Sequence, residues 1–242
     1  MAYQSVNPAT GEVVKTFTPH DQQKIDQTLE RAQALFKSDW SQHDHLPQRL
    51  DVLLKFADLL LEQKEQLATL MSSEMGKLIA QGRDEIELCA GIARYYSAQA
   101  AEFLKPVQYP TDLGEAWVEN HPLGLIMAVE PWNFPFYQLM RVFAPNYAIG
   151  NPVMLKHASI VPQCAEKFEA LIRDAGAPDG AFTNLFISPD QVAEIIADQR
   201  VQGVALTGSE GAGSVVAQEA GKHLKKSTLE LGGNDVFVVL DD

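Results

Sequence analysis

The sequence predicts an α/β fold built on a parallel sheet with helices on both faces, preceded by a helical N-terminal segment and a β-hairpin. The main observation is that short apolar segments alternate with helical segments from Leu123 onward, which is the pattern of βαβ units. In addition, the preceding part of the chain has helical periodicity without this alternation. A length of 242 residues allows one large domain or two small ones.

The N-terminal segment is expected to begin with two short strands and to continue as helices. Turn-forming pairs between Val6 and Val13 favour a strand, a turn and a second strand. Helices are predicted for residues 21–38 and for about 83–104. Residues 47–70 are predicted to form one amphipathic helix, because leucines recur there at i, i+3, i+4 and i+7.

Residues 106–122 are predicted to form a β-hairpin. Apolar residues alternate with polar ones on both sides of a turn-forming run at 112–115. The polar outer positions would leave a strand edge that needs cover.

Strands and helices are predicted to alternate downstream of the hairpin. The strands are short apolar runs at Leu123–Val129, Pro152–Lys156, Ala181–Ile187, Gly203–Leu206 and Ser227–Leu231. The helices between them span about 137–149, 162–175, 190–198 and 210–224. A further strand of the buried type is predicted at Val236–Leu240, and residues 236–242 are interpreted as the start of another domain.

Composition and charge exclude several classes of function. The formal net charge is -13, with 32 acidic and 19 basic residues, so neither a nucleic-acid partner nor an anionic membrane surface is expected. The 2 cysteines are too few for a disulfide framework. The first residues lack a basic-then-apolar leader pattern, and no apolar run has the length of a membrane span. A cytoplasmic location is therefore expected.

The most distinctive segment is Glu130–Pro135, which reads E-P-W-N-F-P between a predicted strand and a predicted helix. Such a turn lies at the carboxyl end of a parallel sheet, where α/β proteins bind ligands. Its prolines fix the backbone, so Trp132 and Asn133 are displayed at a rigid corner. The Asn133 amide is a neutral donor suited to an oxyanion. In isolation, the same segment could be a turn with a packed tryptophan.

Arg141 follows in a helix that is otherwise apolar. Its charge cannot be lost, so it needs an anionic partner. Two interpretations stay open here, namely a structural salt bridge and recognition of a carboxylate on a substrate.

The segment Leu206–Gly213 reads L-T-G-S-E-G-A-G and joins a strand to a helix. Ser209, after Gly208, is a candidate N-cap, and the free amides of a helix start favour a phosphate. The G-x-G-x-x-G fingerprint is absent, so this turn is a weak signal by itself.

The segment Thr228–Asn234 reads T-L-E-L-G-G-N and places Glu230 at an apolar strand end. Burial there would raise the pKa of Glu230 and make it a general base. A buried structural glutamate is the alternative. The paired glycines allow a cofactor or another backbone to approach closely.

Together with Lys156–Ser159, which reads K-H-A-S, these segments resemble in content and order the cofactor-binding half of the NAD(P)-dependent aldehyde dehydrogenases. The resemblance extends from the N-P-A-T-G run at 7–11 to Gly233. It implies a Rossmann-like fold of the aldehyde dehydrogenase type. In the succinate-semialdehyde branch of the family, an arginine follows P-W-N-F-P at the offset of Arg141, which favours succinate semialdehyde or a similar ω-carboxy aldehyde as the substrate.

The resemblance also implies a site for NADP or NAD. Lys156 would hydrogen-bond the adenosine ribose. At the position of Ser159 the family has a glutamate or a serine. A glutamate would repel a 2′-phosphate and Ser159 does not, so NADP is admissible. His157 replaces a common proline, and we assign it no chemical role. The residues expected to contact the cofactor are Trp132, Lys156, Ser159, Gly208, Ser209 and Leu231.

For catalysis, the resemblance implies that a cysteine thiolate attacks the aldehyde and that hydride passes to the nicotinamide. Asn133 would hold the oxyanion, and Glu230 would activate the water that hydrolyses the thioester. Neither Cys89 nor Cys164 lies in the family's nucleophile motif, which follows E-L-G-G by a few dozen residues. We therefore expect an N-terminal half that is inactive alone, with the nucleophile beyond this chain.

The domains are assigned on the same basis. Residues 1–105 would be the N-terminal helical part of the cofactor-binding domain, 106–122 an oligomerisation-type hairpin, 123–235 the dinucleotide-binding domain and 236–242 the start of a catalytic domain. The expected partners are a small aldehyde and, at full length, further copies of the chain. No metal is implied.

Two other functions stay open. A non-catalytic dinucleotide-binding module would bind NADP and gain no activity on extension. An interaction or structural protein reusing this fold would have a stable partner chain.

Overall fold

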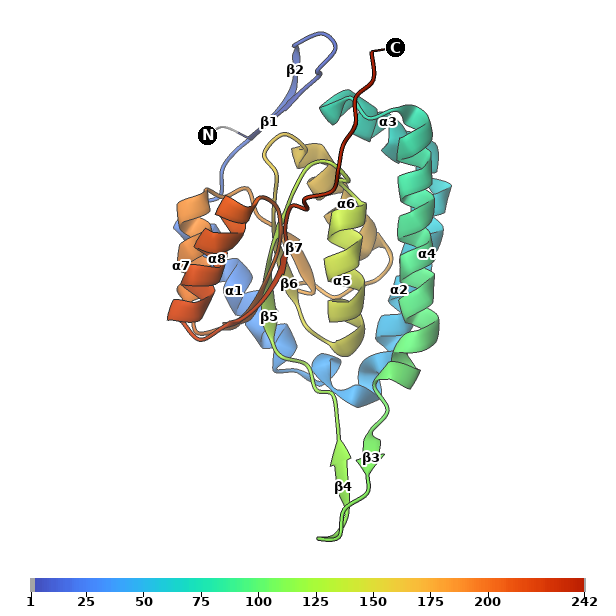
Figure 1. Ribbon diagram of the computed structural model, residues 1–242, viewed down its shortest axis with the longest axis vertical. Helices are drawn as coiled ribbons and strands as arrows, with labels where there is room; N and C mark the ends of the chain where they lie inside the picture. Colours follow the sequence, from blue (N-terminus) through green and yellow to red (C-terminus); the bar gives the residue numbers. More distant parts are fainter. Residues whose placement is uncertain (1–2, 242) are drawn as a thin grey trace.

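A five-stranded parallel sheet organises the chain in the computed structural model, which describes residues 3–241 (Figure 1). The strand order is β7-β6-β5-β8-β9, and all neighbouring strands run parallel. The strands are β5 (Leu125–Glu130), β6 (Val153–His157), β7 (Phe182–Asn184), β8 (Val201–Thr207) and β9 (Lys226–Glu230). The predicted α/β class is confirmed. The order reverses between β5 and β8, which makes that position the topological switch point.

Helices cover both faces of the sheet, as predicted (Figure 1). One face carries α1 (Gln22–Phe36), α7 (Pro189–Ala197) and α8 (Glu210–Lys222), and the other carries α5 (Tyr137–Ile149) and α6 (Pro162–Asp174). Two apolar clusters fill these interfaces. Side chains alternate along β5, so Ile126 belongs to one cluster and Met127 to the other.

An outer layer of helices packs over α5 and α6, and it comprises α2 (Leu46–Glu62), α3 (Lys64–Met75) and α4 (Ile79–Phe103). The prediction of one helix over residues 47–70 is wrong, because the helix is interrupted at Gln63 and a second helix follows. Leu67 and Met71 continue the apolar stripe beyond the break. Periodicity alone therefore does not reveal the change of direction. Two short 3-10 helices, η1 (Asp39–Ser41) and η2 (His43–His45), precede this layer.

Buried side chains from distant elements fix both ends of α5. At its start, the Glu85 carboxylate accepts backbone hydrogen bonds from Phe136 and Tyr137. At its end, the fully buried Arg49 donates to the carbonyl oxygens of Ala148 and Ile149. A carboxylate at the N-terminus of a helix and a cation at its C-terminus both complement the helix dipole. These contacts therefore fix the position of helix α5 relative to the sheet.

Two small antiparallel pairs stand outside the main sheet. Strands β1 (Tyr3–Val6) and β2 (Val13–Phe17) confirm the predicted strand, turn and strand. Strands β3 (Val107–Tyr109) and β4 (Ala116–Val118) confirm the predicted hairpin, which projects from the body (Figure 1).

The strand predicted at Val236–Leu240 is wrong for the part of the chain that is described. This segment is extended and exposed, and it pairs with none of the described strands. An apolar run forms a strand only where a neighbouring strand supplies the backbone hydrogen bonds.

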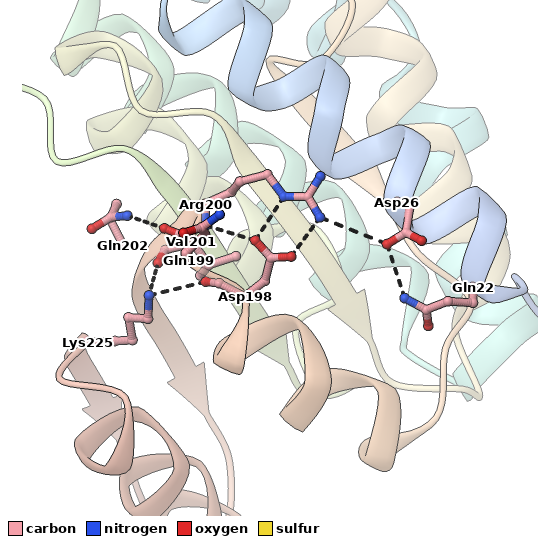
Figure 2. Close-up of polar contacts among 8 residues, drawn as sticks. All are labelled: Gln22, Asp26, Asp198, Gln199, Arg200, Val201, Gln202 and Lys225. Atoms are coloured by element: carbon pink, nitrogen blue, oxygen red, sulfur yellow. Dashed lines mark hydrogen bonds and ion pairs between the residues drawn. The ribbon is translucent and has the colours of Figure 1, made fainter.

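A polar network fastens the amino-terminal end of β8, at the opposite end of the sheet from the carboxyl edge (Figure 2). Arg200 donates to both carboxylate oxygens of Asp198, at 2.8 and 2.6 Å, and also reaches Asp26 on α1. Lys225 donates to the carbonyl oxygens of Asp198 and Val201. The network joins α1 to the turns that precede β8 and β9. In the described residues, no helix is long and apolar enough to cross a membrane.

Candidate active site

The carboxyl ends of the parallel strands bring the sequence-predicted residues to one edge of the sheet. Each predicted segment directly follows or ends a strand, so the parallel register places them side by side. The segments are Trp132 and Asn133 after β5, Lys156 and Ser159 at β6, Gly208 and Ser209 after β8, and Glu230 and Leu231 at β9. The edge includes the switch point between β5 and β8.

The corner that carries Trp132 and Asn133 is closed by His157 of β6. The ring nitrogens lie 3.1 Å from the carbonyl oxygens of Glu130 and Pro135, which are the two ends of the corner. Burial lowers the pKa of His157 to about 4. The neutral ring therefore donates to one carbonyl only. The substitution of histidine for proline, to which the sequence assigned no role, thus has a structural one.

Lys77 supports the same corner from the turn before α4. Its Nζ donates to the Asn133 carbonyl oxygen at 3.0 Å and pairs with a Glu85 carboxylate oxygen at 2.6 Å. It also lies 3.5 Å from the centre of the Phe134 ring, in the geometry of a cation–π contact. Both members of the ion pair are buried. Sequence reasoning did not find them, because they belong to a segment that showed only helical periodicity.

Trp132 and Asn133 themselves point outward from this fixed backbone. Trp132 is 48% exposed, and Asn133 is also exposed. The backbone of the corner is held from behind, and its side chains are free to contact a ligand.

The two residues expected at the ribose lie on β6 and in the turn that follows it. Lys156 is partly buried, and burial lowers the pKa of its amine. Its Nζ donates to the His157 carbonyl oxygen at 3.3 Å and lies 5.9 Å from the centre of the Tyr3 ring. Ser159 is partly buried in the turn.

The turn between β8 and α8 has the predicted cap. The Ser209 hydroxyl accepts a hydrogen bond from the Ala212 amide at 3.3 Å, which confirms the N-cap. Leu231 packs against the first turn of this helix, since a Cβ placed on Gly213 would lie 2.5 Å from its methyl carbon. The helix start and the end of β9 are thus in direct contact, and Leu231 is itself 43% exposed.

The expectation that Glu230 is buried at an apolar strand end is wrong. Strand β9 is the outermost strand on its side of the sheet, and the Glu230 side chain is 52% exposed. One of its carboxylate oxygens lies 2.7 Å from Nη2 of Arg141. The salt-bridge interpretation of Arg141 is therefore the one observed, and its partner is the proposed base itself.

The buried carboxyl at this edge is Glu130, which sequence reasoning passed over. Glu130 is 4% exposed, and burial raises its pKa to about 8. The available signal was its place at the end of an apolar run that lies in the centre of the sheet. A sequence does not say which of two strand ends is covered.

Arg141 lies between two cavities. One, of about 420 Å³, lies between α4 and α5 and is lined in part by Ile92, Tyr95 and Tyr137. The other, of about 190 Å³, lies at the sheet edge and reaches Glu130 and Glu230. A larger surface cavity, of about 750 Å³, lies between α3 and α6 and contains none of the site residues. Of the sequence-predicted site residues, Arg141 and Glu230 line the smaller cavities.

The cysteines lie apart from this edge. Cys89 on α4 and Cys164 on α6 are fully buried, and burial raises the pKa of each thiol well above its usual value. A buried neutral thiol is a poor nucleophile. In the described residues, no group of three or more metal-ligating side chains is placed to hold a metal ion.

The whole chain matches a known family model. The model of the aldehyde dehydrogenase family matches residues 1–242. A succinate-semialdehyde dehydrogenase from Deinococcus radiodurans, named for NADP(+), is 46% identical over 99% of this chain and 50% of its own length. A probable enzyme of the same name from Synechocystis is 44% identical over 100% of this chain and 53% of its own length.

Solved structures agree. The succinic semialdehyde dehydrogenase of Streptococcus pyogenes, crystallised with NADP+, superposes with a TM-score of 0.95 at 51% identity. The match covers 100% of this chain and 53% of that one. The chain spans about half the length of the curated relatives it matches.

Proposed function

Because the chain belongs to the aldehyde dehydrogenase family, we propose that it forms the cofactor-binding half of an enzyme that oxidises an aldehyde to the carboxylic acid with NADP+ or NAD+. The observation that carries the proposal is the gathering of the corner after β5, the end of β6, the start of α8 and the end of β9 at one sheet edge. That edge holds the switch point, where open α/β sheets bind ligands.

The residues at the edge fit a phosphorylated dinucleotide. The capped start of α8 offers backbone amides and the positive end of a helix dipole to a phosphate. Lys156 and Ser159 lie at the end of the neighbouring strand. The neutral hydroxyl of Ser159 does not repel a 2′-phosphate. The relatives from Deinococcus and Synechocystis are named for NADP(+), so we propose NADP+ as the preferred cofactor and NAD+ as the alternative.

Replacing Ser159 with glutamate is expected to weaken binding of NADP+ by the 242-residue chain about tenfold or more, because each 1.4 kcal/mol of charge repulsion costs a factor of ten. NAD+ lacks the phosphate, so its affinity should change little. Titration calorimetry with both cofactors measures this. Ser159→Gln is the matched control, with a similar size and no charge. Equal losses for both cofactors in Ser159→Glu would contradict the assignment.

For catalysis, we propose that the Asn133 amide donates to the oxyanion and that Glu230 takes a proton from the hydrolytic water. The bound cofactor would accept the hydride. The thiolate nucleophile would come from outside these residues, since Cys89 and Cys164 are buried as neutral thiols. The contacts that His157 and Lys77 make with the corner would hold the Asn133 amide in place.

Arg141 is proposed to bind the distal carboxylate of a succinate semialdehyde-like substrate. Its guanidinium lies at the boundary between the cavity beside α4 and the cavity at the sheet edge. A guanidinium forms paired hydrogen bonds with a carboxylate. Because Glu230 occupies Arg141 in the structure, the substrate carboxylate would take the place of Glu230, and Glu230 would become free to act as the base.

In the full-length enzyme, Arg141→Gln is expected to raise KM for succinate semialdehyde by one to two orders of magnitude, at roughly 1.4 kcal/mol per factor of ten. The KM for butanal, which has the same length and no carboxylate, should change little. Steady-state assays with both aldehydes separate the two cases. An equal rise in KM for both aldehydes would mean that Arg141 only stabilises the fold or positions Glu230.

A non-catalytic dinucleotide-binding module is the second candidate, favoured by the burial of both cysteines. It requires NADP+ binding by the chain and no aldehyde oxidation by the full-length protein. The projecting β3–β4 hairpin, with exposed Tyr109 and Trp117, is proposed to contact another copy of the chain in an oligomer.

A further inference from the structure

Glu130 is a buried carboxyl at the centre of the sheet edge, and nothing in the proposed mechanism uses it. Its side chain is buried, and its Oε2 has no hydrogen-bond partner among the described residues. Thr207, at the end of the adjacent strand β8, lies beside the carboxyl and favours its ionised form. A buried carboxyl oxygen without a partner is unusual and costly.

The unpartnered oxygen has a polar neighbourhood. Glu130, Arg141, Thr207 and Glu230 line the same cavity of about 190 Å³. The register explains this, because Thr207 pairs with Glu230 across β8 and β9 and lies beside β5. A polar cavity of this volume can hold several water molecules. The two carboxyls therefore share one small compartment with one guanidinium.

The charges in this compartment are coupled. Burial raises the pKa of Glu130 to about 8, the Arg141 guanidinium lowers it, and the Glu230 carboxylate raises it. His157 on β6, which is neutral, contacts the Glu130 backbone carbonyl oxygen. At neutral pH, the fold thus keeps a proton on Glu130, and Arg141 has one anionic partner, Glu230.

We propose that Glu130 is a proton-holding positioning residue that competes with Glu230 for Arg141. With Glu130 protonated, Arg141 holds Glu230. With Glu130 ionised, the guanidinium is shared between two carboxylates, and Glu230 is released to act as the base. The step is the loss or gain of one proton at Glu130, exchanged with water in the cavity. The proposal rests on the base role proposed for Glu230 and adds the group that governs when that role is available.

Glu130 and Glu230 line one cavity with Arg141, so the ionisation of Glu130 is expected to change the surroundings of the Glu230 carboxylate. The side-chain carboxyl signals of the 242-residue chain, labelled with ¹³C-glutamate, would be followed by NMR from about pH 5 to about pH 10. Glu130→Gln and Glu230→Gln assign the two signals. The Glu130 signal is expected to titrate near pH 8. The Glu230 signal is expected to show an inflection at the same pH, because ionisation of Glu130 moves Arg141 away from it.

In Glu130→Gln, the alkaline inflection of Glu230 should disappear. The matched control is Glu169→Gln, which removes another carboxyl whose pKa is raised by burial but which faces neither Arg141 nor Glu230. The control should leave the alkaline inflection of the Glu230 signal unchanged. If glutamine at position 130 prevents folding, Glu130→Leu is the second variant, since it removes the charge and keeps the site apolar.

The proposal is overturned if Glu130 titrates at its ordinary value in the parent chain. It is equally overturned if Glu230 shows no alkaline inflection, or if that inflection persists without Glu130. The measurement needs neither cofactor nor turnover. A failure of NADP+ binding or of aldehyde oxidation would therefore sink the proposed function and leave this result to be decided separately.

Discussion

Lys77→Met is expected to lower the free energy of unfolding by about 3–5 kcal/mol, because it leaves the Glu85 charge buried without its cation. The pair is almost completely covered, with exposed side-chain fractions of 5% and 0%. The same change removes the donor to the Asn133 carbonyl oxygen and the cation above the Phe134 ring. Urea unfolding followed by circular dichroism measures the loss.

The chain contains a matched control, a second lysine that pairs with a glutamate of α4. Lys64 begins α3 and pairs with Glu87 on α4 at 2.8 Å, in an exposed setting. Lys64→Met should leave the urea midpoint nearly unchanged, because water screens exposed pairs. The double variant Lys77→Met/Glu85→Gln should recover part of the loss, since no charge then remains buried. A parent-like midpoint for Lys77→Met would show that the pair does not hold the corner.

Acidification is expected to destabilise the chain through His157. Its pKa is about 4 in the folded chain against 6.5 for an unperturbed histidine. Folding therefore favours the neutral ring, and the contribution of His157 is complete above about pH 6.5 and is lost as the pH falls towards 4. A difference of this size amounts to roughly 3 kcal/mol, at about 1.4 kcal/mol for each pKa unit. Unfolding free energies of the parent and of His157→Gln, measured across this window, reveal the slope as their difference.

His157→Gln should remove that slope, because glutamine does not titrate. His121, exposed beside the hairpin, provides the control, and His121→Gln should keep the slope. Glu130 changes the stability of the parent in the opposite direction. Its pKa is raised by burial, so its contribution to stability is lost as the pH rises towards about 8. The difference between parent and variant isolates the histidine. An acid slope that survives in His157→Gln would mean that other groups produce it.

The position of the candidate site followed from the sequence to a large extent. The alternation of strands and helices implied a parallel sheet, and a parallel sheet gathers its carboxyl ends at one edge. Trp132, Lys156 and Ser209 therefore lie where their places after predicted strands put them. Their residue types already indicated a phosphate and an oxyanion. Local pattern carries this information because strand direction depends only on the order of the elements.

The roles of the charged groups did not follow. Glu130 and Glu230 both end a strand, and the sequence favoured burial of the wrong one. The sheet order makes β5 the central strand and β9 an outermost strand. Glu130 is therefore desolvated, whereas the Glu230 side chain stays half exposed. The partners of the corner are far away in sequence, with Lys77 just before α4 and Glu85 on α4.

The sequence by itself determined the fold class, the edge at which the chemistry gathers and the family to which the chain belongs. These properties depend on the hydrophobic periodicity, on the order of strands and helices, and on residue type. Only the tertiary structure decided which carboxyl keeps its proton, which anion Arg141 holds and what fixes the Asn133 corner. Those properties depend on desolvation and on charge separation across the fold. Both are set by what covers a side chain, and the covering residues come from distant parts of the chain.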